Sequence, residues 1–493
     1  MKTLVQAGSI VEALYKQAHE RGSRVVVIDN DENQINYEDL WKEVQGFATY
    51  LSSQGIATGD KVVIKSAHTI NYVVSFLAVH LVGAISIPTE KSIGNDGLDS
   101  VAGQLDASMV IADDYTADIK VVEISKVREL ALANIPAEEI TSFPDTNAVG
   151  DILFTTGTTG KSKGVMISHR AIIAVCENVL YGAKIPEDNI YMVPNPINHA
   201  AGIRKIYVTI LTGTTVVLID GFMNLKKFFR FATDYKVTSI LMPPSAIRIM
   251  MLMARKNMAA LSDQLDHIHS GSAPLSDADK QRLRETLPNT RLYFGYGSSE
   301  AGCSCLYDYN EHDQLVNCSG MPNVNATIMI VDDDRKEIVG TKENPGTVAV
   351  KGPMNMEGYY NEPELTAGVL DENGIVYTTD LGYMENGFLY ILGRKDDVIN
   401  IGGLKIAPNE VESIALKFPG VSECILYSIT DKKDNMTIVM DVVLEKGAEF
   451  DNVKFTAFLG ETLEAFKIPK KVTIVDEIKK TYNGKIDRKA YRN

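Results

Sequence analysis

The chain has 493 residues, of which 45% are hydrophobic and 23% are charged, and its formal net charge is -15. These fractions are typical of globular proteins and exclude an extensively disordered chain. The negative balance, without a long basic run, argues against nucleic acid as a partner, because binding to a phosphate backbone needs clustered Lys and Arg.

The N-terminal segment MKTLVQAGSIVEALYKQ predicts a short amphipathic helix, because no apolar stretch is followed by a small-residue cleavage site. No apolar run is long enough to predict a membrane span. The five cysteines are irregularly spaced, which favours reduced thiols over a disulfide framework. Cys303 and Cys305 with nearby His312 invite a metal-site interpretation, but their spacing is unlike that of a tetrahedral zinc site. We therefore expect a cytoplasmic protein.

After this helix, short runs rich in β-branched residues alternate with helix-like stretches, a pattern typical of parallel α/β layers. Residues 224–235 predict an amphipathic helix that covers such a sheet, because helical spacing is shared by Leu225, Phe228, Phe229, Ala232 and Tyr235. The methionine-rich segment IRIMMLMARKNM is interpreted as a core helix. The predicted strands are RVVVID, KVVIKSA, AISIP, MVIADD, DILFTT, NIYMVPN, TTVVLID, VTSILM, LDHIHSG and TRLYFGYG.

Between about residues 320 and 393 short strands and turns predominate, as in ATIMIVDDD, GTVAVKG and GFLYILG. Few helical periods occur there, so the segment predicts a small antiparallel or barrel-like unit.

The last hundred or so residues change pattern again. A helical segment places Val411, Ile414, Ala415 and Phe418 on one face, and strand-like ECILYSI, TIVMDVVLE and KVTIVDE follow, with a helix near 452–466. This is the pattern of a compact α+β domain. The predicted fold class is therefore α/β, with a large N-terminal domain of two βα-layered subdomains plus a small β-barrel-like unit, followed by a small C-terminal domain.

The run TTGTTGKSKG, residues 155–164, is typical of a loop that holds phosphate. Gly160, Lys161 and Ser162 match the end of a P-loop, but Thr155 stands where the first glycine is required. A P-loop ATPase or kinase is therefore the runner-up, and a flexible surface turn is the plain alternative.

The same run still offers glycines, hydroxyl donors and a lysine between two predicted strands. Thr156, Thr158 and Thr159 could donate hydrogen bonds to a triphosphate tail while Lys163 neutralises its charge.

Taken with its flanks, this run resembles a known family. ILFTTGTTGKSKGVMISH is similar to the signature loop of the adenylate-forming superfamily, which includes acyl-CoA synthetases, aryl-CoA ligases, luciferases and the adenylation domains of peptide synthetases. Further matches follow in the family's order over roughly residues 20–493: INHAAG, SGSAPL, YGSSE, GTVAVKGPMNMEGYYNEPELT, YTTDLGYMENGFLYILGRKDDVINIGGLKIAPNEVE and NGKIDRKAY. The resemblance implies an ATP- and Mg²⁺-dependent acyl-CoA synthetase that converts a carboxylic acid to acyl-AMP, releases pyrophosphate and passes the acyl group to coenzyme A.

The resemblance also implies where the nucleotide binds. Tyr296 would stack on adenine, Ser299 would hydrogen-bond the α-phosphate and Glu300 would ligate Mg²⁺. Asp380 would accept both ribose hydroxyls, and Arg394 would hold the ribose and nucleotide. The other implied contacts are the phosphate loop, Thr156, Gly157, Thr158, Thr159, Gly160 and Lys163, and the small residues beside the nucleotide, Gly271, Ser272, Ala273, Gly297 and Ser298.

The implied C-terminal domain, residues 394–493, is a mobile cap on the N-terminal domain, residues 1–393. Lys485 would reach the substrate carboxylate and the α-phosphate during adenylation. Asp396 matches the family's hinge position near 394–396, and Gly402 and Gly403 would lie along the channel that admits the coenzyme A thiol.

His199 is the implied lining residue of the acyl pocket, and Arg204 leaves room for a polar substituent on an otherwise apolar acyl or aryl group. Amino-acid-activating relatives carry an Asp in this segment, and NPINHAAGIRKIY has none, which weakens an amino-acid substrate. The other implied lining residues are small: Ala200, Ala201, Gly202, Ser272, Ala273, Ala301, Gly302 and Cys303.

Three residues depart from the family pattern. Ser162 replaces a proline, Ser299 replaces a threonine but keeps the hydroxyl, and Thr379 replaces a glycine without an assigned role. Two other functions stay open: transfer of the acyl group to the phosphopantetheine arm of an acyl carrier protein, and nucleotide binding without turnover.

Overall fold

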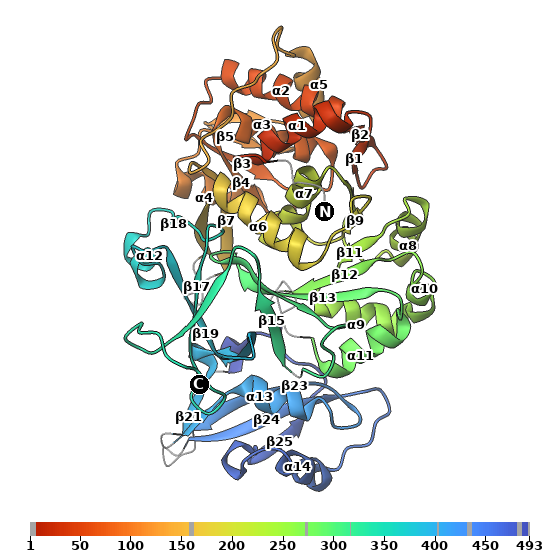
Figure 1. The fold of residues 1–493 in the computed structure, drawn as a ribbon, viewed down its shortest axis with the longest axis vertical. Helices are drawn as coiled ribbons and strands as arrows, with labels where there is room; N and C mark the ends of the chain where they lie inside the picture. Colours follow the sequence, from red (N-terminus) through yellow and green to blue (C-terminus); the bar gives the residue numbers. More distant parts are fainter. Residues whose placement is uncertain are drawn as a thin grey trace.

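The computed structural model describes residues 6–156, 162–271, 275–315, 317–401, 404–430, 436–480 and 486–491. Two large sheets with their helices form the main body, and a three-stranded sheet with its own helices lies apart from them at the bottom of Figure 1. Within these ranges, no helix combines the length and apolarity needed to cross a membrane.

The smaller of the two large sheets has seven strands in the order β18-β8-β7-β4-β3-β5-β6. β7 and β8 form an antiparallel hairpin, whereas the strands from β7 to β6 run parallel. Its strands are β3 (Lys61–Lys65), β4 (Ile85–Thr89), β5 (Met109–Ile111), β6 (Lys120–Val122), β7 (Val149–Thr156), β8 (Ser162–Ser168) and β18 (Gly358–Tyr359). The predicted strands KVVIKSA, AISIP, MVIADD and DILFTT are thereby confirmed.

The larger sheet has thirteen strands in the order β16-β17-β19-β20-β15-β14-β13-β12-β11-β9-β10-β1-β2. The strands from β1 to β13 in this order run parallel, as the βα alternation predicts, and antiparallel pairing begins at β14. The strands are β1 (Val25–Ile28), β2 (Gln34–Asn36), β9 (Ile190–Val193), β10 (Thr215–Leu218), β11 (Ser239–Leu241), β12 (His267–Gly271), β13 (Arg291–Ser298), β14 (Gly302–Asp308), β15 (Cys318–Pro322), β16 (Thr327–Val331), β17 (Gly346–Lys351), β19 (Ile375–Glu385) and β20 (Phe388–Arg394).

The predicted antiparallel unit is the far end of this sheet. β15 pairs with β14 on one side and with β20 on the other, so the unit continues the larger sheet. Among the described strands β16 forms the edge, which leaves the unit an open, curved sheet where the sequence suggested a barrel-like one. Gly320 makes the close packing between β15 and β14 possible, because a Cβ there would lie 2.3 Å from the Leu306 carbonyl carbon.

Helices fill the space between the two large sheets and cover their outer faces. One core joins the inner faces of both sheets to helices that lie between or above them: α1 (Ile10–Arg21), α2 (Tyr37–Ser53), α3 (Ile70–Val82), α5 (Val127–Ala133), α6 (His169–Gly182) and α7 (Ala200–Thr212). The outer face of the smaller sheet packs on α4 (Asn95–Leu105). The outer face of the larger sheet packs on α8 (Leu225–Asp234), α9 (Pro244–Met253), α10 (Arg255–Ala259) and α11 (Asp277–Thr286), at the right of Figure 1. Short elements complete the main body: η1 (Ile124–Lys126) and α12 (Pro363–Val369).

The predicted amphipathic helix of residues 224–235 is confirmed as α8, but its buried face differs from the predicted stripe. Phe228, Phe231 and Ala232 are fully buried, whereas Leu225, Phe229 and Tyr235 are only partly buried. Helical spacing fits either Phe229 or Phe231, so the sequence alone does not decide between them. The methionine-rich segment is core on one face only: Met250, Met251 and Met258 are buried, whereas Leu252 and Met253 are exposed.

The C-terminal segment forms a separate α+β unit with its own core, as predicted. Val411 and Ala415 of its first helix are fully buried, and Ile414 and Phe418 pack at the edge. Its elements are η2 (Lys395–Asp397), β21 (Ile399–Ile401), β22 (Leu404–Ile406), α13 (Pro408–Ala415), β23 (Val421–Thr430), β24 (Met436–Leu444), α14 (Asn452–Gly460), η3 (Ala465–Lys467), β25 (Lys471–Ile474) and η4 (Arg488–Tyr491).

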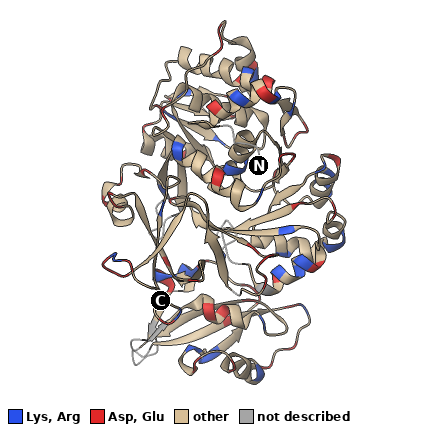
Figure 2. Ribbon diagram, in the orientation of Figure 1, with Lys and Arg blue, Asp and Glu red and all other residues tan. Residues whose placement is uncertain are grey.

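Acidic and basic residues are interspersed along the outer helices (Figure 2). This distribution differs from the continuous basic stripe of nucleic-acid-binding domains.

Candidate active site

The glycine-rich run joins β7 to β8, so the predicted strand–loop–strand arrangement is present. The two strands pair Thr155 with Lys163 on either side of the loop. Residues Gly157, Thr158, Thr159 and Gly160, and the side chain of Thr156, lie outside the described parts of the chain. Their contacts with phosphate therefore stay predictions.

Lys163 connects this hairpin to a second motif. Its Nζ lies 5.0 Å from the centre of the Tyr359 ring on β18, a cation–π distance. The Tyr359 hydroxyl donates a hydrogen bond of 2.9 Å to Oε1 of Glu300. Burial raises the pKa of Tyr359, so its hydroxyl stays a donor. Lys163, Tyr359 and Glu300 thus form one contact chain between the phosphate-loop hairpin and the predicted Mg²⁺ ligand.

Tyr359 is a site residue that its sequence pattern alone does not single out. It lies within the matched segment GTVAVKGPMNMEGYYNEPELT, so the signal was the motif itself. Two adjacent tyrosines occur there, and only the register of β18 against β8 decides which one reaches Glu300. Tyr359 pairs with Val165, and its neighbour Tyr360 instead donates to the Leu105 carbonyl.

The nucleotide-site candidates Tyr296 and Asp380 meet directly. The Tyr296 hydroxyl donates a hydrogen bond of 2.7 Å to Oδ2 of Asp380. Their strands, β13 and β19, are separated by β14, β15 and β20 in the sheet order, which would place them about 19 Å apart in a flat sheet. The antiparallel part of the sheet therefore curls strongly to form this contact.

Burial is the largest influence on Asp380 and raises the pKa of its carboxyl group, which the Tyr296 hydrogen bond and Arg394 oppose. With Oδ2 bound to Tyr296, Oδ1 is the oxygen that accepts no hydrogen bond among the described residues. The carboxylate therefore has an acceptor to offer to a hydroxyl-bearing ligand.

Arg394 ends β20 directly opposite Asp380 in the strand register. Its Nη2 donates a hydrogen bond of 2.7 Å to Oγ1 of Thr379. This contact gives a structural explanation for a departure from the family pattern, because a glycine at position 379 could not accept it.

Ser299 and Glu300 lie in the tight turn between β13 and β14. The guanidinium of Arg204 donates to the carbonyl oxygens of Ser298 and Ser299, each at 3.4 Å. Gly297 is required at this turn, since a Cβ there would lie 1.9 Å from the Gly302 carbonyl oxygen. Of the predicted neighbours, Gly271 ends β12 next to β13 in the sheet, whereas Ser272 and Ala273 lie outside the described residues.

Several predicted acyl-pocket residues gather where α7 begins. His199 is the N-cap residue of α7, and its carbonyl oxygen accepts from the amide of Gly202 at 3.0 Å. Gly202 packs so tightly that a Cβ would lie 2.4 Å from the Pro196 carbonyl oxygen. Ala301, Gly302 and Cys303 are buried at the start of β14.

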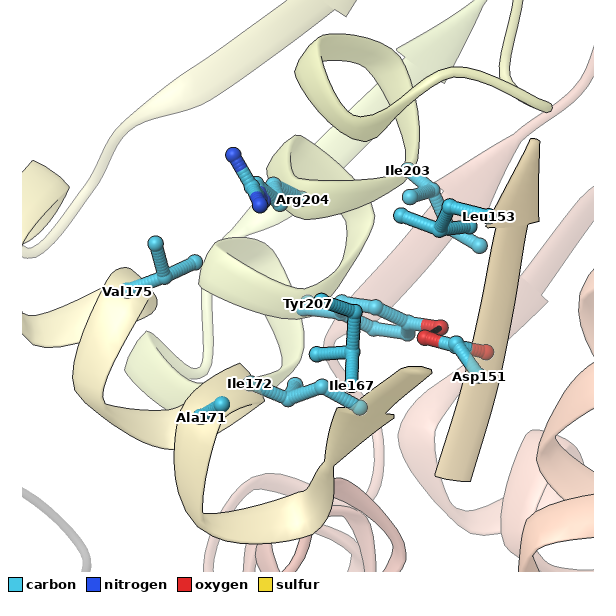
Figure 3. Close-up of a pocket in the computed structure, with 9 residues that line it drawn as sticks. All are labelled: Asp151, Leu153, Ile167, Ala171, Ile172, Val175, Ile203, Arg204 and Tyr207. Atoms are coloured by element: carbon cyan, nitrogen blue, oxygen red, sulfur yellow. Dashed lines mark hydrogen bonds between the residues drawn. The ribbon is translucent and has the colours of Figure 1, made fainter. Parts of the chain in front are cut away.

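A small cavity lies between β7, β8, α6 and α7 (Figure 3). Its volume is about 10 Å³, the space of roughly one water molecule. At one end Asp151 accepts hydrogen bonds from His80 Nε2 at 3.0 Å and from the Tyr207 hydroxyl at 2.8 Å. Arg204 lines the other end, with its guanidinium directed away from Asp151. This cavity is too small for an acyl group and is part of the buried polar framework behind the site.

Glu300 fits the chemistry of a Mg²⁺ ligand. Mg²⁺ keeps several waters and usually binds through one or two carboxylates together with substrate phosphates. Tyr359 holds Oε1 of Glu300, which orients the carboxylate and leaves Oε2 available. The parts of the chain that the structure describes contain no group of three or more His, Cys, Asp or Glu side chains arranged to hold a metal ion.

All five cysteines are free and buried. Burial raises the pKa of Cys303 and Cys305, so both remain thiols. His312 packs its ring against Phe388, with 4.9 Å between ring centres. Lys485, Gly402 and Gly403 lie outside the described residues, and their roles stay predictions.

Comparison with known proteins identifies the class of this fold and site. The family model of the AMP-binding enzymes matches residues 14–360, and the model of the AMP-binding enzyme C-terminal domain matches residues 410–485. The chain therefore belongs to the AMP-binding enzyme family.

Individual relatives resemble the chain along almost its full length. Peroxisomal OPC-8:0-CoA ligase 1 of Arabidopsis thaliana is 28% identical over 96% of this chain and 90% of its own. Among solved structures, ATP-bound MatB from Rhodopseudomonas palustris has a TM-score of 0.88 at 22% identity, covering 98% of both chains. O-succinylbenzoate coenzyme A synthetase from Bacillus subtilis, in complex with ATP and magnesium ion, has a TM-score of 0.84 at 22% identity, covering 97% of this chain and 98% of its own. At these identities the two structures establish the fold.

Proposed function

We propose that this chain is an ATP-dependent acyl-CoA synthetase. It activates a carboxylic acid as acyl-AMP with release of pyrophosphate, and then transfers the acyl group to the thiol of coenzyme A. Family membership over both parts of the chain supports this proposal, as does a full-length relative named as a CoA ligase. The five buried free thiols support a reducing compartment such as the cytoplasm.

The observation that carries the proposal is the contact chain from Lys163 through Tyr359 to Glu300, next to the Tyr296–Asp380 hydrogen bond. This arrangement supports the proposal, because it would bring together a cation beside the phosphate loop, a carboxylate suited to Mg²⁺ and an acceptor for the ribose hydroxyls. These are the groups that the transfer of a nucleotide from ATP requires.

In the first half-reaction an oxygen of the substrate carboxylate bonds to the α-phosphorus of ATP, and the bond from that phosphorus to the bridging oxygen breaks. Lys163 and the preceding loop bind the departing pyrophosphate, and Ser299 donates to the α-phosphate. When bound at Glu300, Mg²⁺ offsets negative charge on the phosphates as a Lewis acid. Lys485 adds a positive charge between the carboxylate and the α-phosphate.

The nucleoside is held by residues of the curled sheet. Asp380 accepts the ribose hydroxyls, with Tyr296 fixing one carboxylate oxygen and presenting its ring to the adenine. Arg394 contacts the nucleotide from the edge of the site, and Thr379 orients it.

In the second half-reaction the coenzyme A thiol attacks the acyl carbon and AMP leaves. We assign residues 1–393 and 394–493 to two domains that rotate about Asp396, so that the channel near Gly402 and Gly403 admits the thiol. The separate core of the C-terminal unit supports this division. Exposed polar side chains contact each other across the boundary, as Lys395 does Asp333 at 2.5 Å and Asn317 does Ser413 at 3.3 Å.

Pyrophosphate release from ATP tests this proposal. The full chain is assayed with Mg²⁺ and a panel of fatty, aromatic, dicarboxylic and amino acids, with and without coenzyme A. We expect release that depends on the acid, acyl-AMP detectable by mass spectrometry without coenzyme A, and a thioester with it.

Binding of ATP without acid-dependent pyrophosphate release from any acid would contradict the proposal. That result would favour a nucleotide-binding protein without turnover. Thioester formation only on an acyl carrier protein would correct the acceptor and leave the adenylation step intact.

A further inference from the structure

We infer that the acid this enzyme activates carries a second carboxylate, which Lys205 binds at the end of the acyl pocket. This inference rests on the proposed function, because it concerns the substrate of that same site. The observation behind the inference is the buried ammonium group of Lys205. It has no negatively charged partner among the described residues, and it lies where a substrate chain would end.

Lys205 follows the predicted acyl-pocket residue Ala201 by one helical turn on α7. Residues four apart lie on the same face of a helix, so the Lys205 side chain continues the face that Ala201 begins. Cys303, another predicted pocket residue, is among the groups that act electrostatically on Lys205. Lys205 therefore lies beyond the small residues that line the expected pocket.

Neutral groups surround the Lys205 ammonium. The residue is only 3% exposed, and its Nζ donates a hydrogen bond of 2.9 Å to Nδ1 of His269. The same Nζ lies 5.1 Å from the centre of the Tyr191 ring. Burial and the nearby Lys205 lower the pKa of His269 well below its usual value, so the imidazole is neutral.

No described carboxylate forms an ion pair with Lys205, and the acidic groups that act on the neighbouring Arg204 have other partners. Asp151 is held by His80 and Tyr207, and Glu300 is held by Tyr359. Arg204, adjacent in sequence, adds a second positive charge instead of compensating the first. Burying a charge without a partner costs free energy, so a buried, unpaired ammonium group indicates that a ligand supplies the missing negative charge.

A second observation points to a ligand at this place. The Tyr191 hydroxyl is fully buried and has no hydrogen-bond partner among the described residues. Burial raises its pKa, so it is a donor like the lysine. On the pocket side, Gly295 keeps the space between His269 and Cys303 free of a side chain. A Cβ there would lie 2.9 Å from His269 Nε2 and 3.6 Å from Cys303 Sγ.

The chemistry of these groups selects the class of ligand. An ammonium with N–H donors to spare and an unpaired phenolic hydroxyl both require an acceptor that carries negative charge. A carboxylate at the far end of the acid meets both requirements. A monocarboxylic acid of the same length would bury an apolar end against an ammonium.

The test compares matched acids on the full chain. Butyrate, hexanoate and octanoate are compared with succinate, adipate and suberate in ATP–pyrophosphate exchange and in calorimetric binding. We expect a higher kcat/KM for at least one diacid than for its matched monoacid. In Lys205→Met we expect kcat/KM for that diacid to fall about 10²-fold, with a rise for the monoacid, because the variant removes a buried charge partner.

Lys280 provides a matched control on the opposite face of the same sheet. It is also a buried lysine, stacked on the rings of Phe294, Tyr307 and Tyr309, and it lies on α11 away from α7. Lys280→Met should leave the preference for the diacid unchanged. Circular dichroism of both variants checks that they are folded.

Three outcomes separate this inference from the proposed function. Equal or better turnover of monoacids by the wild type overturns the inference while the synthetase assignment stands. If no acid is turned over but a diacid binds the wild type and not Lys205→Met, the synthetase assignment falls, and only the role of Lys205 as a carboxylate-binding residue stands. If neither turnover nor binding of a diacid is seen, both are wrong.

Discussion

Thr379 departs from the family pattern, and its hydrogen bond with Arg394 explains this departure. The hydroxyl of Thr379 accepts the Arg394 hydrogen bond next to Asp380, so the side chain preorganises an exposed arginine at the rim of the nucleotide site. A contact of this kind costs little to form, since both partners are on one pair of neighbouring strands.

We predict that Thr379→Val raises KM for ATP by about threefold to tenfold with little change in kcat, because one hydrogen bond contributes about 0.5–1.5 kcal/mol. Thr379→Ser keeps the hydroxyl acceptor and should leave KM for ATP near its wild-type value. Steady-state kinetics at saturating acid measures both variants. An unchanged KM in Thr379→Val would show that the contact does not position Arg394.

Tyr359 is a second residue whose role follows from one contact. Tyr359→Phe keeps the ring beneath Lys163 but removes the donor to Glu300. We expect kcat/KM for ATP to fall about tenfold or more, because hydrogen bonds to charged groups contribute about 1.5–3 kcal/mol. We also expect half-maximal rate to require more Mg²⁺.

The neighbouring tyrosine supplies the control for that experiment. Tyr360→Phe removes a hydroxyl that donates to a backbone carbonyl away from Glu300. If Tyr359→Phe and Tyr360→Phe have the same kinetics and the same Mg²⁺ dependence, the proposed link to Glu300 is wrong.

At the scale of elements, α6 packs against β7 through a buried histidine. His169 is the first residue of α6, and burial, with the nearby His80, lowers its pKa to about 3. The groups around it come from three other elements. His80 of α3 contacts its ring directly, and Asp151 of β7 and Tyr207 of α7 complete the hydrogen-bonded cluster that includes His80. Gly150 allows this packing, since a Cβ there would lie 2.8 Å from the His169 ring.

This packing predicts a loss of stability in acid. Below pH 6.5 the unfolded chain binds a proton at His169, whereas the folded chain does not bind it until about pH 3. The stability that the neutral, buried His169 allows above pH 6.5 is therefore lost as the pH falls. Between pH 6.5 and pH 5, His169 alone should lower the free energy of unfolding by about 2 kcal/mol. Urea unfolding of wild type and His169→Phe at pH 7 and pH 5 measures it. Equal pH dependence in the two proteins would contradict the account.

The elements also show what the sequence could predict. The strand runs, α8 and the C-terminal α+β unit follow from local periodicity, and the structure confirms them. The curl that joins Tyr296 to Asp380 could not be predicted, because it depends on a sheet order in which strands distant in sequence become neighbours. The environment of Lys205 could not be predicted for a similar reason, since only the fold shows that its side chain reaches His269 of β12.

At the scale of the whole molecule, two bodies with separate cores meet through a boundary near Arg394. Exposed polar side chains meet there, as between Asn317 and Ser413 at 3.3 Å. A boundary of this kind is weak enough to rearrange between two half-reactions, whereas the nucleotide candidates Tyr296, Asp380 and Glu300 are all held in the larger body.

The central claim is that Lys485 of the C-terminal unit supplies a positive charge to acyl-AMP formation, while the N-terminal domain holds the reacting acid and ATP in position. Single-turnover formation of acyl-AMP, from ATP and the acid that the panel selects, tests it in wild type and in Lys485→Ala. The account predicts formation by the wild type and a rate lower by about 10²-fold or more in the variant. Acyl-AMP formation at the wild-type rate by Lys485→Ala would contradict it.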